Sequence, residues 1–286
     1  MRGCGRPISA MPMRWSRRDE TSLTASTVAS SYTLGNRPPR RNGADGARAM
    51  SDVLLDVQGL SAAYGRAQVL FDVTLQLRAG EVVALVGRNG AGKSTTFKAI
   101  MGLVPARANH LTFRRQDLIG LPTYRIARLG LGYVPEDRRV FTDLTVDENL
   151  EVGRQTARGT RSPWTPERLF RMFPNLAEMR GRPGNQMSGG EQQMLTIART
   201  LMGNPDAILL DEPSEGLAPV IVQMMAEALR AMKGEGLAVL LSEQNWAFAS
   251  AVSDRATVIE RGEIRFAGSI AELKADEGLR ADTLGV

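Results

Sequence analysis

Short runs of apolar residues, each followed by glycine, proline or polar residues, are spread over residues 82–243 of this 286-residue chain. Runs of about four to eight such residues are typical of strands buried on both faces of a parallel sheet. The runs are Val82–Val86, Leu131–Pro135, Ala207–Leu210 and Leu237–Leu241. We therefore predict an α/β core whose parallel strands begin within residues 81–135 and are completed within residues 205–260.

Other stretches predict the parts attached to this core. Residues 53–76 are expected to form antiparallel strands around Tyr64, and residues 137–204 a mostly helical insert. Near the end of the insert, apolar residues at helical spacing mark one face of an amphipathic helix: Met194, Ile197, Ala198 and Leu201. Further along, Ile259–Ile264 predicts a hairpin that turns at Arg261–Gly262.

The segment after the first buried run carries the strongest chemical signal. Residues 87–94 fit the phosphate-binding pattern G-x-x-x-x-G-K-[ST], between a predicted strand and a helix predicted over Thr95–Met101. Such a turn aims successive backbone N–H groups at one point, where a nucleotide polyphosphate fits. Lys93 is expected to contact the β- and γ-phosphates, and Ser94 to offer an oxygen to Mg²⁺. The predicted nucleotide contacts are Gly87, Arg88, Asn89, Gly90, Ala91, Gly92, Lys93, Ser94 and Thr95.

This pattern places the core among the P-loop NTPases. A chance glycine-rich turn is the alternative, which the bare pattern allows in roughly one such chain in fifty, before the strand and helix are considered. The second half of the site follows the run Ala207–Leu210, which ends in Asp211 and Glu212. Asp211 is predicted to hold Mg²⁺ through water, and Glu212 to polarise the water that attacks the γ-phosphate. The alternative for these acids is a strand that merely ends at the surface.

A third element precedes the amphipathic helix. Ser188 is predicted to cap that helix, and Gly189, Gly190 and Glu191 follow it. The exposed N–H groups suit an anion, and a second anion site implies a second nucleotide. The stretch Met187–Gln192 resembles the signature motif of ATP-binding cassette (ABC) ATPases, with Met187 and Glu191 as variants. The resemblance implies that two cassettes sandwich two ATP molecules, with Ser188 to Glu191 contacting the nucleotide of the opposite subunit. An ordinary helix cap is the alternative.

The resemblance covers nearly all of residues 51–286 and assigns further roles. Tyr64 falls where the family places an aromatic ring that stacks on adenine, and Ser214–Pro219 where it places the D-loop. Glu136 stands where the family has the Q-loop glutamine, and can offer Mg²⁺ an anionic oxygen. Gln244 stands in place of the switch histidine. It can donate a hydrogen bond to the γ-phosphate but cannot carry a proton near neutral pH.

These two departures leave two hypotheses about turnover. Proton handling falls on Glu212 or on the phosphate itself, because the chain's one histidine, His110, lies in an unrelated polar stretch. A degenerate, slow ATPase is one hypothesis. We favour an active enzyme, because Lys93, Ser94, Asp211 and Glu212 are all intact. The predicted catalytic residues are Glu212, Lys93 and Gln244, and the predicted metal ligands are Ser94, Asp211 and Glu136.

One branch of the family shares these variants. The strings Gly130–Glu136, Leu144–Leu150, Ser214–Val222 and Glu243–Asn245 resemble the second ATPase of bacterial branched-chain amino acid importers. The ATPases of urea and short-chain amide importers share most of them and remain an alternative. Over Ala106–Gln116 the family usually has glycine-containing turns that this chain lacks, so the sequence does not establish a hairpin there.

The resemblance also implies partners. They are a second ABC ATPase subunit in a heterodimer, two membrane permease subunits, and a periplasmic or extracellular substrate-binding protein. The chain would sit on the cytoplasmic face of the cell membrane through the permeases, one of which inserts a short helix into a groove beside Glu136. A soluble ABC ATPase of translation or DNA repair is less favoured, because the span from Glu136 to Asn204 leaves no room for a coiled-coil insertion. A GTPase is less favoured because Asn-Lys-x-Asp is absent.

Charge divides the chain in two. Residues 1–50 hold nine arginines and three acidic residues, whereas 27 of the 36 basic and 28 of the 31 acidic residues lie in the remainder. The near-neutral remainder, residues 51–286, is the predicted nucleotide-binding domain and offers no footprint for nucleic acid. Residues 1–50 are expected to be a disordered basic extension, either a targeting segment or the product of a misassigned start, with translation beginning at Met50. Cys4, the single cysteine, lies there, so a reducing compartment is expected.

Overall fold

The computed structural model describes residues 53–157 and 162–285, all of which belong to one compact unit. The predicted basic extension, residues 1–50, lies outside the described residues. Within the described ranges, no helix has the length and apolar character that a membrane crossing requires.

An antiparallel sheet forms the first layer. Its long hairpin, β1 and β2, alternates buried and exposed residues along much of its length, as expected for a sheet with one face packed on the core. The shorter strands β4 and β5 pair with β1, and β6 pairs with β5. The strands are β1 (Val53–Tyr64), β2 (Ala67–Arg78), β4 (Ala106–Arg107), β5 (His110–Phe113) and β6 (Gln116–Asp117).

A six-stranded sheet forms the central layer, in the order β11-β10-β3-β9-β8-β7. Only the edge strand β11 is antiparallel; it pairs with β10 in the hairpin predicted at Arg261–Gly262. The strands are β3 (Val82–Val86), β7 (Leu131–Val134), β8 (Ala207–Asp211), β9 (Ala238–Glu243), β10 (Arg255–Glu260) and β11 (Glu263–Ser269). The four apolar runs therefore form β3, β7, β8 and β9, and the predicted α/β P-loop fold is confirmed.

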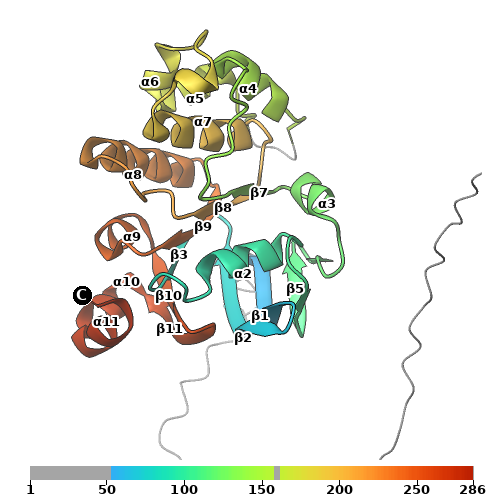
Figure 1. Ribbon diagram of the computed structural model, residues 1–286, viewed down its shortest axis with the longest axis vertical. Helices are drawn as coiled ribbons and strands as arrows, with labels where there is room; N and C mark the ends of the chain where they lie inside the picture. Colours follow the sequence, from blue (N-terminus) through green and yellow to red (C-terminus); the bar gives the residue numbers. More distant parts are fainter. Residues whose placement is uncertain (1–52, 158–161, 286) are drawn as a thin grey trace, which may run out of the picture. The chain divides into compact units, whose positions relative to one another are not determined.

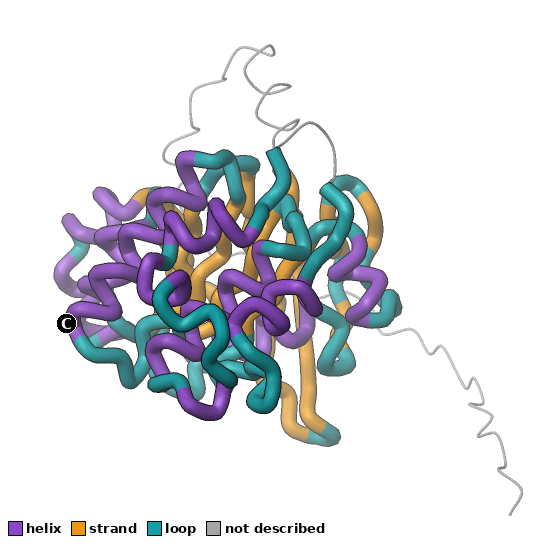
Figure 2. Tube along the Cα trace, turned by 90° about the horizontal axis from the view of Figure 1, so that it is seen from above, coloured by secondary structure: helices purple, strands orange, loops and turns teal. Residues whose placement is uncertain are grey.

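Helices pack beside the strands, as Figure 2 shows from above, and a pair of strands at its lower right extends beyond them. In Figure 1, α4 to α7 gather at one end of the described fold and the hairpin of β1 and β2 lies at the other. The longer helices are α2 (Lys93–Ile100), α4 (Val146–Gly153), α7 (Gly189–Leu201), α8 (Pro219–Gly234) and α11 (Glu277–Leu284). The shorter ones are α3 (Thr123–Arg128), α5 (Pro166–Met172), α6 (Pro174–Ala177), η1 (Gly184–Gln186), α9 (Trp246–Val252) and α10 (Ile270–Ala275).

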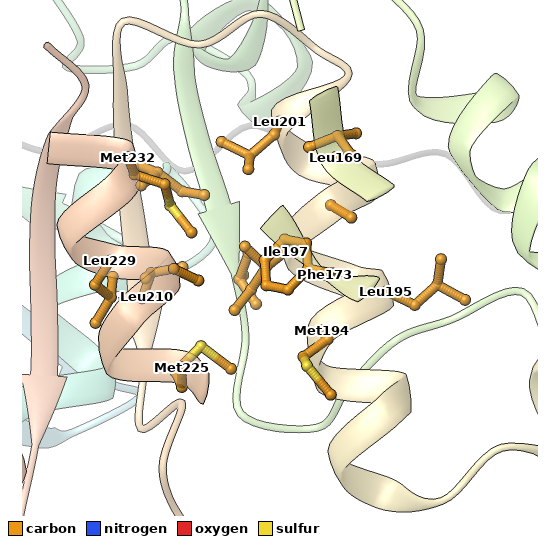
Figure 3. Packing of buried hydrophobic residues seen from close by; sticks show 14 of the residues in the cluster. Leu169, Phe173, Met194, Leu195, Ile197, Leu201, Leu210, Met225, Leu229 and Met232 are labelled. Carbon is orange, nitrogen blue, oxygen red and sulfur yellow. The ribbon is translucent and has the colours of Figure 1, made fainter. Parts of the chain in front are cut away.

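Three hydrophobic cores adjoin the central sheet, and the two larger ones lie on its opposite faces. On β8, Ile208 and Leu210 join the core shared with α7 and α8, whereas Ala207 and Leu209 join the core shared with α2 and the antiparallel sheet. This alternation follows from the two-residue period of a strand. Figure 3 shows the first core, in which apolar side chains of α5, α7 and α8 meet Leu210. Both faces of β8 are buried, which explains its unbroken apolar run.

A hairpin forms in the stretch where the sequence did not establish one. β5 and β6 pair through a two-residue turn at Arg114 and Arg115, whose φ angles are +51° and +65°. Such a turn requires positive φ at both central residues and therefore usually contains glycine or asparagine. Two contacts hold Arg114 in this conformation. Its guanidinium donates a 2.7 Å hydrogen bond to the Asp206 carboxylate, and its backbone N–H donates to the Leu54 carbonyl oxygen.

Candidate functional site

The phosphate loop joins β3 to α2. Gly90 and Gly92 have φ angles of +79° and +112°, which a residue with a Cβ rarely adopts. At Gly87 a Cβ would lie 2.3 Å from the Ile259 carbonyl oxygen, so only glycine fits. Helix α2 begins at Lys93, two residues before the predicted start at Thr95. Its first turn therefore contains Lys93 and Ser94 and no acidic residue, which favours an anion at its N-terminus.

Lys93 lies at the centre of the loop. Its side chain is 3% exposed, and Nζ donates to the carbonyl oxygens of Gly87 at 2.9 Å and Arg88 at 3.1 Å. It also forms an ion pair with Glu212, with 3.1 Å between Nζ and Oε1. A buried ammonium group needs such partners because it has lost its water shell. Lys93 thus connects the phosphate loop directly to the acidic end of β8.

Asp211, at the end of β8, accepts hydrogen bonds from three elements. Its Oδ1 accepts from Ser94 Oγ at 2.9 Å and from Ser242 Oγ at 2.6 Å, and its Oδ2 accepts from Tyr133 OH at 3.2 Å. Burial and the charge of Asp211 raise the pKa of Tyr133, so that hydroxyl stays a donor. The pairing of β8 with β9 explains the Ser242 contact, because Asp211 lies opposite Ser242 on the neighbouring strand.

Sequence reasoning missed Ser242 and Tyr133. The available signal was their place near the carboxyl ends of buried strands β9 and β7, where open α/β sheets bind their ligands. The string Gly130–Glu136 contains Tyr133 but gave it no site role, and Ser242 follows an apolar run, so the strand order is what reveals their contacts with Asp211.

Glu212 adopts a left-handed backbone conformation, with φ at +46°. This conformation costs on the order of 1–2 kcal/mol for a residue with a side chain and is often found at functional sites. The Glu212 N–H is satisfied by Ser242, with the carbonyl oxygen and the hydroxyl each 3.1 Å away. The turn brings the carboxylate to Lys93, and the residue is 9% exposed.

The remaining residues predicted for the same nucleotide are more exposed. Glu136 lines a cleft of about 570 Å³ together with Tyr133 and Asp211, which places its loop beside the predicted metal ligands. Gln244 follows β9 and is exposed. Tyr64 ends β1 and is 49% exposed, so its ring is accessible for stacking.

Ser188 caps α7 and forms a capping box with Glu191. The Ser188 Oγ accepts from the Glu191 N–H at 3.4 Å, and a Glu191 carboxylate oxygen accepts from the Ser188 N–H at 2.7 Å. The capping prediction is therefore correct, and the box stabilises the helix start. A Cβ at Gly189 would lie nearest to the guanidinium group of Arg138, and a Cβ at Gly190 nearest to the side chain of Ile221.

Glu243 was not predicted as a site residue, yet it is buried at the end of β9. It is 2% exposed, and its carboxylate accepts from the backbone N–H of Ser214 at 3.0 Å and of Asn245 at 3.3 Å. Burial raises the pKa of Glu243 to about 7, although the hydrogen bonds from Ser214 and Asn245 oppose the shift. Glu243 thus fastens the loop after Glu212 to the loop that carries Gln244.

This burial predicts a pH dependence of stability. The folded-state pKa of Glu243 lies above the ordinary value, so the folded chain binds the proton more tightly than the unfolded chain does. Stability is therefore expected to fall by roughly 3 kcal/mol as pH rises from about 4.5 to 7. Glu243→Gln should flatten the dependence of Tm on pH over this range, as followed by thermal unfolding. Glu227→Gln, on the exposed face of α8, is the control. An unchanged pH dependence in Glu243→Gln would contradict this account.

The cluster fits a nucleotide triphosphate with a magnesium ion. A Cβ at Gly87 would meet the Ile259 carbonyl oxygen, and the φ angle of Gly92 disfavours a side chain, so the backbone itself forms the cradle. The Ser94 and Asp211 oxygens provide the all-oxygen donor set that Mg²⁺ prefers. When bound, Mg²⁺ would neutralise charge on the phosphate oxygens. Lys93 and Glu212 are the chain neighbours of Ser94 and Asp211, and they form an ion pair with each other.

The chain resembles known proteins over most of the described residues. A family model described as ABC transporter matches residues 70–215. The branched-chain amino acid transport ATP-binding protein BraG of Pseudomonas aeruginosa is 40% identical over 232 residues, which span 81% of this chain and 100% of BraG. The lipopolysaccharide export ATP-binding protein LptB of Escherichia coli K12 is 34% identical over 233 residues, 81% of this chain and 97% of LptB.

Solved structures agree with these sequence similarities. An ATP-binding subunit of an ABC transporter superposes with a TM-score of 0.68 at 32% identity and covers 81% of this chain and 96% of its own. A nucleotide-free ATP-binding cassette superposes with a TM-score of 0.67 at 24% identity, over 79% of this chain and 96% of its own. The second likeness concerns the fold alone.

Proposed function

This chain belongs to the ABC transporter family of ATP-binding domains, and from that premise we propose that it energises the import of branched-chain amino acids. As a family member it is an ATPase subunit that works with membrane permease components. The finer assignment, to branched-chain amino acid import, is supported by the similarity to BraG over that protein's whole length. The identity to BraG, 40%, exceeds the 34% to the exporter subunit LptB.

Hydrolysis is proposed to occur in a site completed by a second cassette. Lys93 pairs with Glu212, and Ser242 links the Glu212 N–H to Asp211. Ser188 and Gly189 instead lie at the start of α7, beside Arg138. A helix N-terminus with exposed N–H groups suits a phosphate group brought by another subunit. We propose that Ser188 to Glu191 contact the partner's ATP, and that Tyr64, Glu136 and Gln244 contact the ATP held by this chain.

Ser188→Ala tests this composite site. Removal of the hydroxyl is expected to lower hydrolysis by the assembled dimer about tenfold, because one hydrogen bond to a charged phosphate is lost. ATP binding by a single chain should change little. Ser269→Ala is the matched control, because Ser269 forms the same type of capping box with Glu272 on α10. Both variants lose a cap that contributes about 1 kcal/mol. Equal loss of binding and hydrolysis in Ser188→Ala would contradict a shared site.

Docking to a permease is proposed at a groove beside β7. A cleft of about 460 Å³ adjoins the cleft that contains Glu136, and the two share Tyr133, Arg199 and Thr200. Around it Tyr124, Phe141 and Val152 are 56%, 47% and 53% exposed. Clustered exposed apolar side chains beside a cleft favour a protein-binding surface. We propose that a short helix of a permease subunit occupies this groove, which places the chain on the cytoplasmic face of the cell membrane.

Heterodimer formation with a second ABC ATPase subunit is part of the same proposal. The full assembly would also contain two permease subunits and a periplasmic or extracellular substrate-binding protein. Purification of the chain from its native cells tests the assembly. Recovery of a different cassette and of permease subunits supports the proposal, and recovery of ribosomes or DNA would contradict it.

Uptake by intact cells tests the substrate. Cells that lack this gene are expected to lose uptake of labelled leucine and to keep uptake of labelled urea. The wild-type gene should restore leucine uptake, whereas a gene encoding Glu212→Gln should not. Loss of urea uptake alone would assign the chain to a urea or amide importer, and unchanged uptake of leucine would overturn the proposed substrate.

A further inference from the structure

Arg138 lies between three segments that the proposed composite site uses. It follows Glu136 in the loop after β7, and its Nη2 donates a 2.7 Å hydrogen bond to the carbonyl oxygen of Glu215. Glu215 lies in the loop after Glu212, and its own N–H donates to the Glu212 carbonyl at 3.2 Å. Arg138 is therefore linked, through Glu215, to the backbone that carries Glu212.

The other edge of the guanidinium group rests on the start of α7. A Cβ at Gly189 would lie 2.2 Å from Arg138 Nη1, a distance that no side chain permits. Glycine at this position thus leaves room for the arginine. On the opposite side, a Cβ at Gly216 would lie 3.5 Å from Arg138 Nη2. The planar group consequently fits between the start of α7 and the loop 214–216, which a lysine ammonium could not fill in the same way.

This placement is costly for the fold. Arg138 has a φ angle of +47°, a left-handed conformation that is unfavourable for a residue with a side chain. The backbone after it is held in a tight turn, since the Val140 N–H donates to the Arg138 carbonyl at 2.7 Å. A cation beside the N-terminus of a helix is also unfavourable for the helix dipole. Strain that the surrounding structure maintains is often associated with function.

We propose that Arg138 is a positioning residue that clamps the loop 214–216 to the N-terminus of α7. The clamp fixes the distance between the loop that follows Glu212 and the segment Ser188–Gly190. In the proposed dimer, Glu212 faces the ATP held by this chain, and Ser188–Gly190 face the ATP held by the partner. The loop of Arg138 also contributes Glu136 and Asp137 to the cleft of about 570 Å³. The clamp therefore connects this cleft to the loop 214–216 and to the N-terminus of α7. The inference rests on the proposed composite site. It adds to that site the residue that keeps the loop after Glu212 and the start of α7 at a fixed separation.

The experiment uses the complex of the full chain with its companion cassette and permeases. Arg138→Ala is expected to lower kcat for ATP hydrolysis about tenfold, since one charge-assisted hydrogen bond is lost, and to change KM less than twofold. Arg138→Lys keeps the charge without the planar fork and should recover part of the activity. Arg154→Ala is the matched control, because Arg154 forms an exposed ion pair with Glu151 on α4.

A second readout separates positioning from loss of folded protein. This readout is ATP-dependent closure of the dimer, measured in chains that carry Glu212→Gln. Adding Arg138→Ala should raise about tenfold the ATP concentration at which half of the dimers are closed. The number of ATP molecules bound per chain at saturation should stay unchanged. Loss of sites in proportion to activity would assign Arg138 to stability alone and overturn the proposal. Wild-type kcat and closure in Arg138→Ala would overturn it as well. If the complex with Arg138 intact shows no ATP-dependent closure, the proposed composite site itself fails, and the clamp fails with it.

The contact with Gly189 supplies an independent check. Gly189→Ala places a methyl group where the guanidinium lies, so it should displace Arg138. If the two residues form one clamp, the losses of kcat in Gly189→Ala and Arg138→Ala will be less than additive in the double variant. Fully additive losses would show that the two residues act separately and would contradict the clamp.

Discussion

Replacing Glu212 with glutamine is expected to slow ATP hydrolysis by about 10²–10⁴ and to leave ATP binding intact. The carboxylate lies at the end of β8, turned by its left-handed backbone toward Lys93. Glutamine has the same size but cannot accept a proton from water near neutral pH. The side chain also ceases to compete with phosphate for Lys93, so ATP affinity should be equal or higher. Single-turnover hydrolysis and binding of a fluorescent ATP analogue measure the two quantities.

The control for this variant is Glu227→Gln, which removes one carboxylate from the exposed face of α8. It should hydrolyse ATP at the wild-type rate. Wild-type turnover in Glu212→Gln would remove Glu212 from its proposed role and assign proton transfer to the phosphate itself.

Replacing Lys93 with alanine is expected to weaken ATP binding by about 10²–10³, because charge-assisted hydrogen bonds to the phosphates are lost. The variant also removes the donor to the Gly87 and Arg88 carbonyl oxygens and leaves the Glu212 carboxylate without its cation. Loss of one member of a buried ion pair costs about 3–5 kcal/mol, so a lower Tm is expected as well. Isothermal titration with ATP and thermal unfolding without ATP measure the two effects separately.

Lys274→Ala, on the exposed face of α10, is the control for loss of one positive charge. It should bind ATP as the wild type does. A Lys93→Met variant restores apolar packing around the aliphatic part of the side chain and should recover part of the stability without recovering affinity. ATP binding by Lys93→Ala within threefold of the wild type would contradict the assignment of Lys93 to the phosphates.

Several parts of the site could be predicted because a local pattern defines them. Gly87, Gly92 and Lys93 lie within one loop, where spacing alone fixes the geometry. Ser188 caps α7 as predicted, because a capping box involves only residues three apart. Other partners could not be predicted in this way. Ser242 reaches Asp211 because β9 lies beside β8, and the chain does not indicate which strands are neighbours.

The hairpin of β5 and β6 illustrates the same limit. Arg114 and Arg115 are poor residues for a turn with positive φ, and no local rule favours them. The pairing of β5 with β1 and the contact of Arg114 with Asp206 provide the stabilisation that the turn lacks. Tertiary contacts therefore override the local preference.

By itself, the sequence determined the fold class, the phosphate loop and the strands of the core, because each depends on residue type and spacing within a short segment. Only the tertiary structure decided which side chains surround Asp211, that Lys93 pairs with Glu212, and that Arg138 joins the loop of Glu215 to α7. These contacts join residues far apart along the chain. Their formation depends on the order of strands in the sheet and on the paths of loops, which are set by the packing of the whole domain.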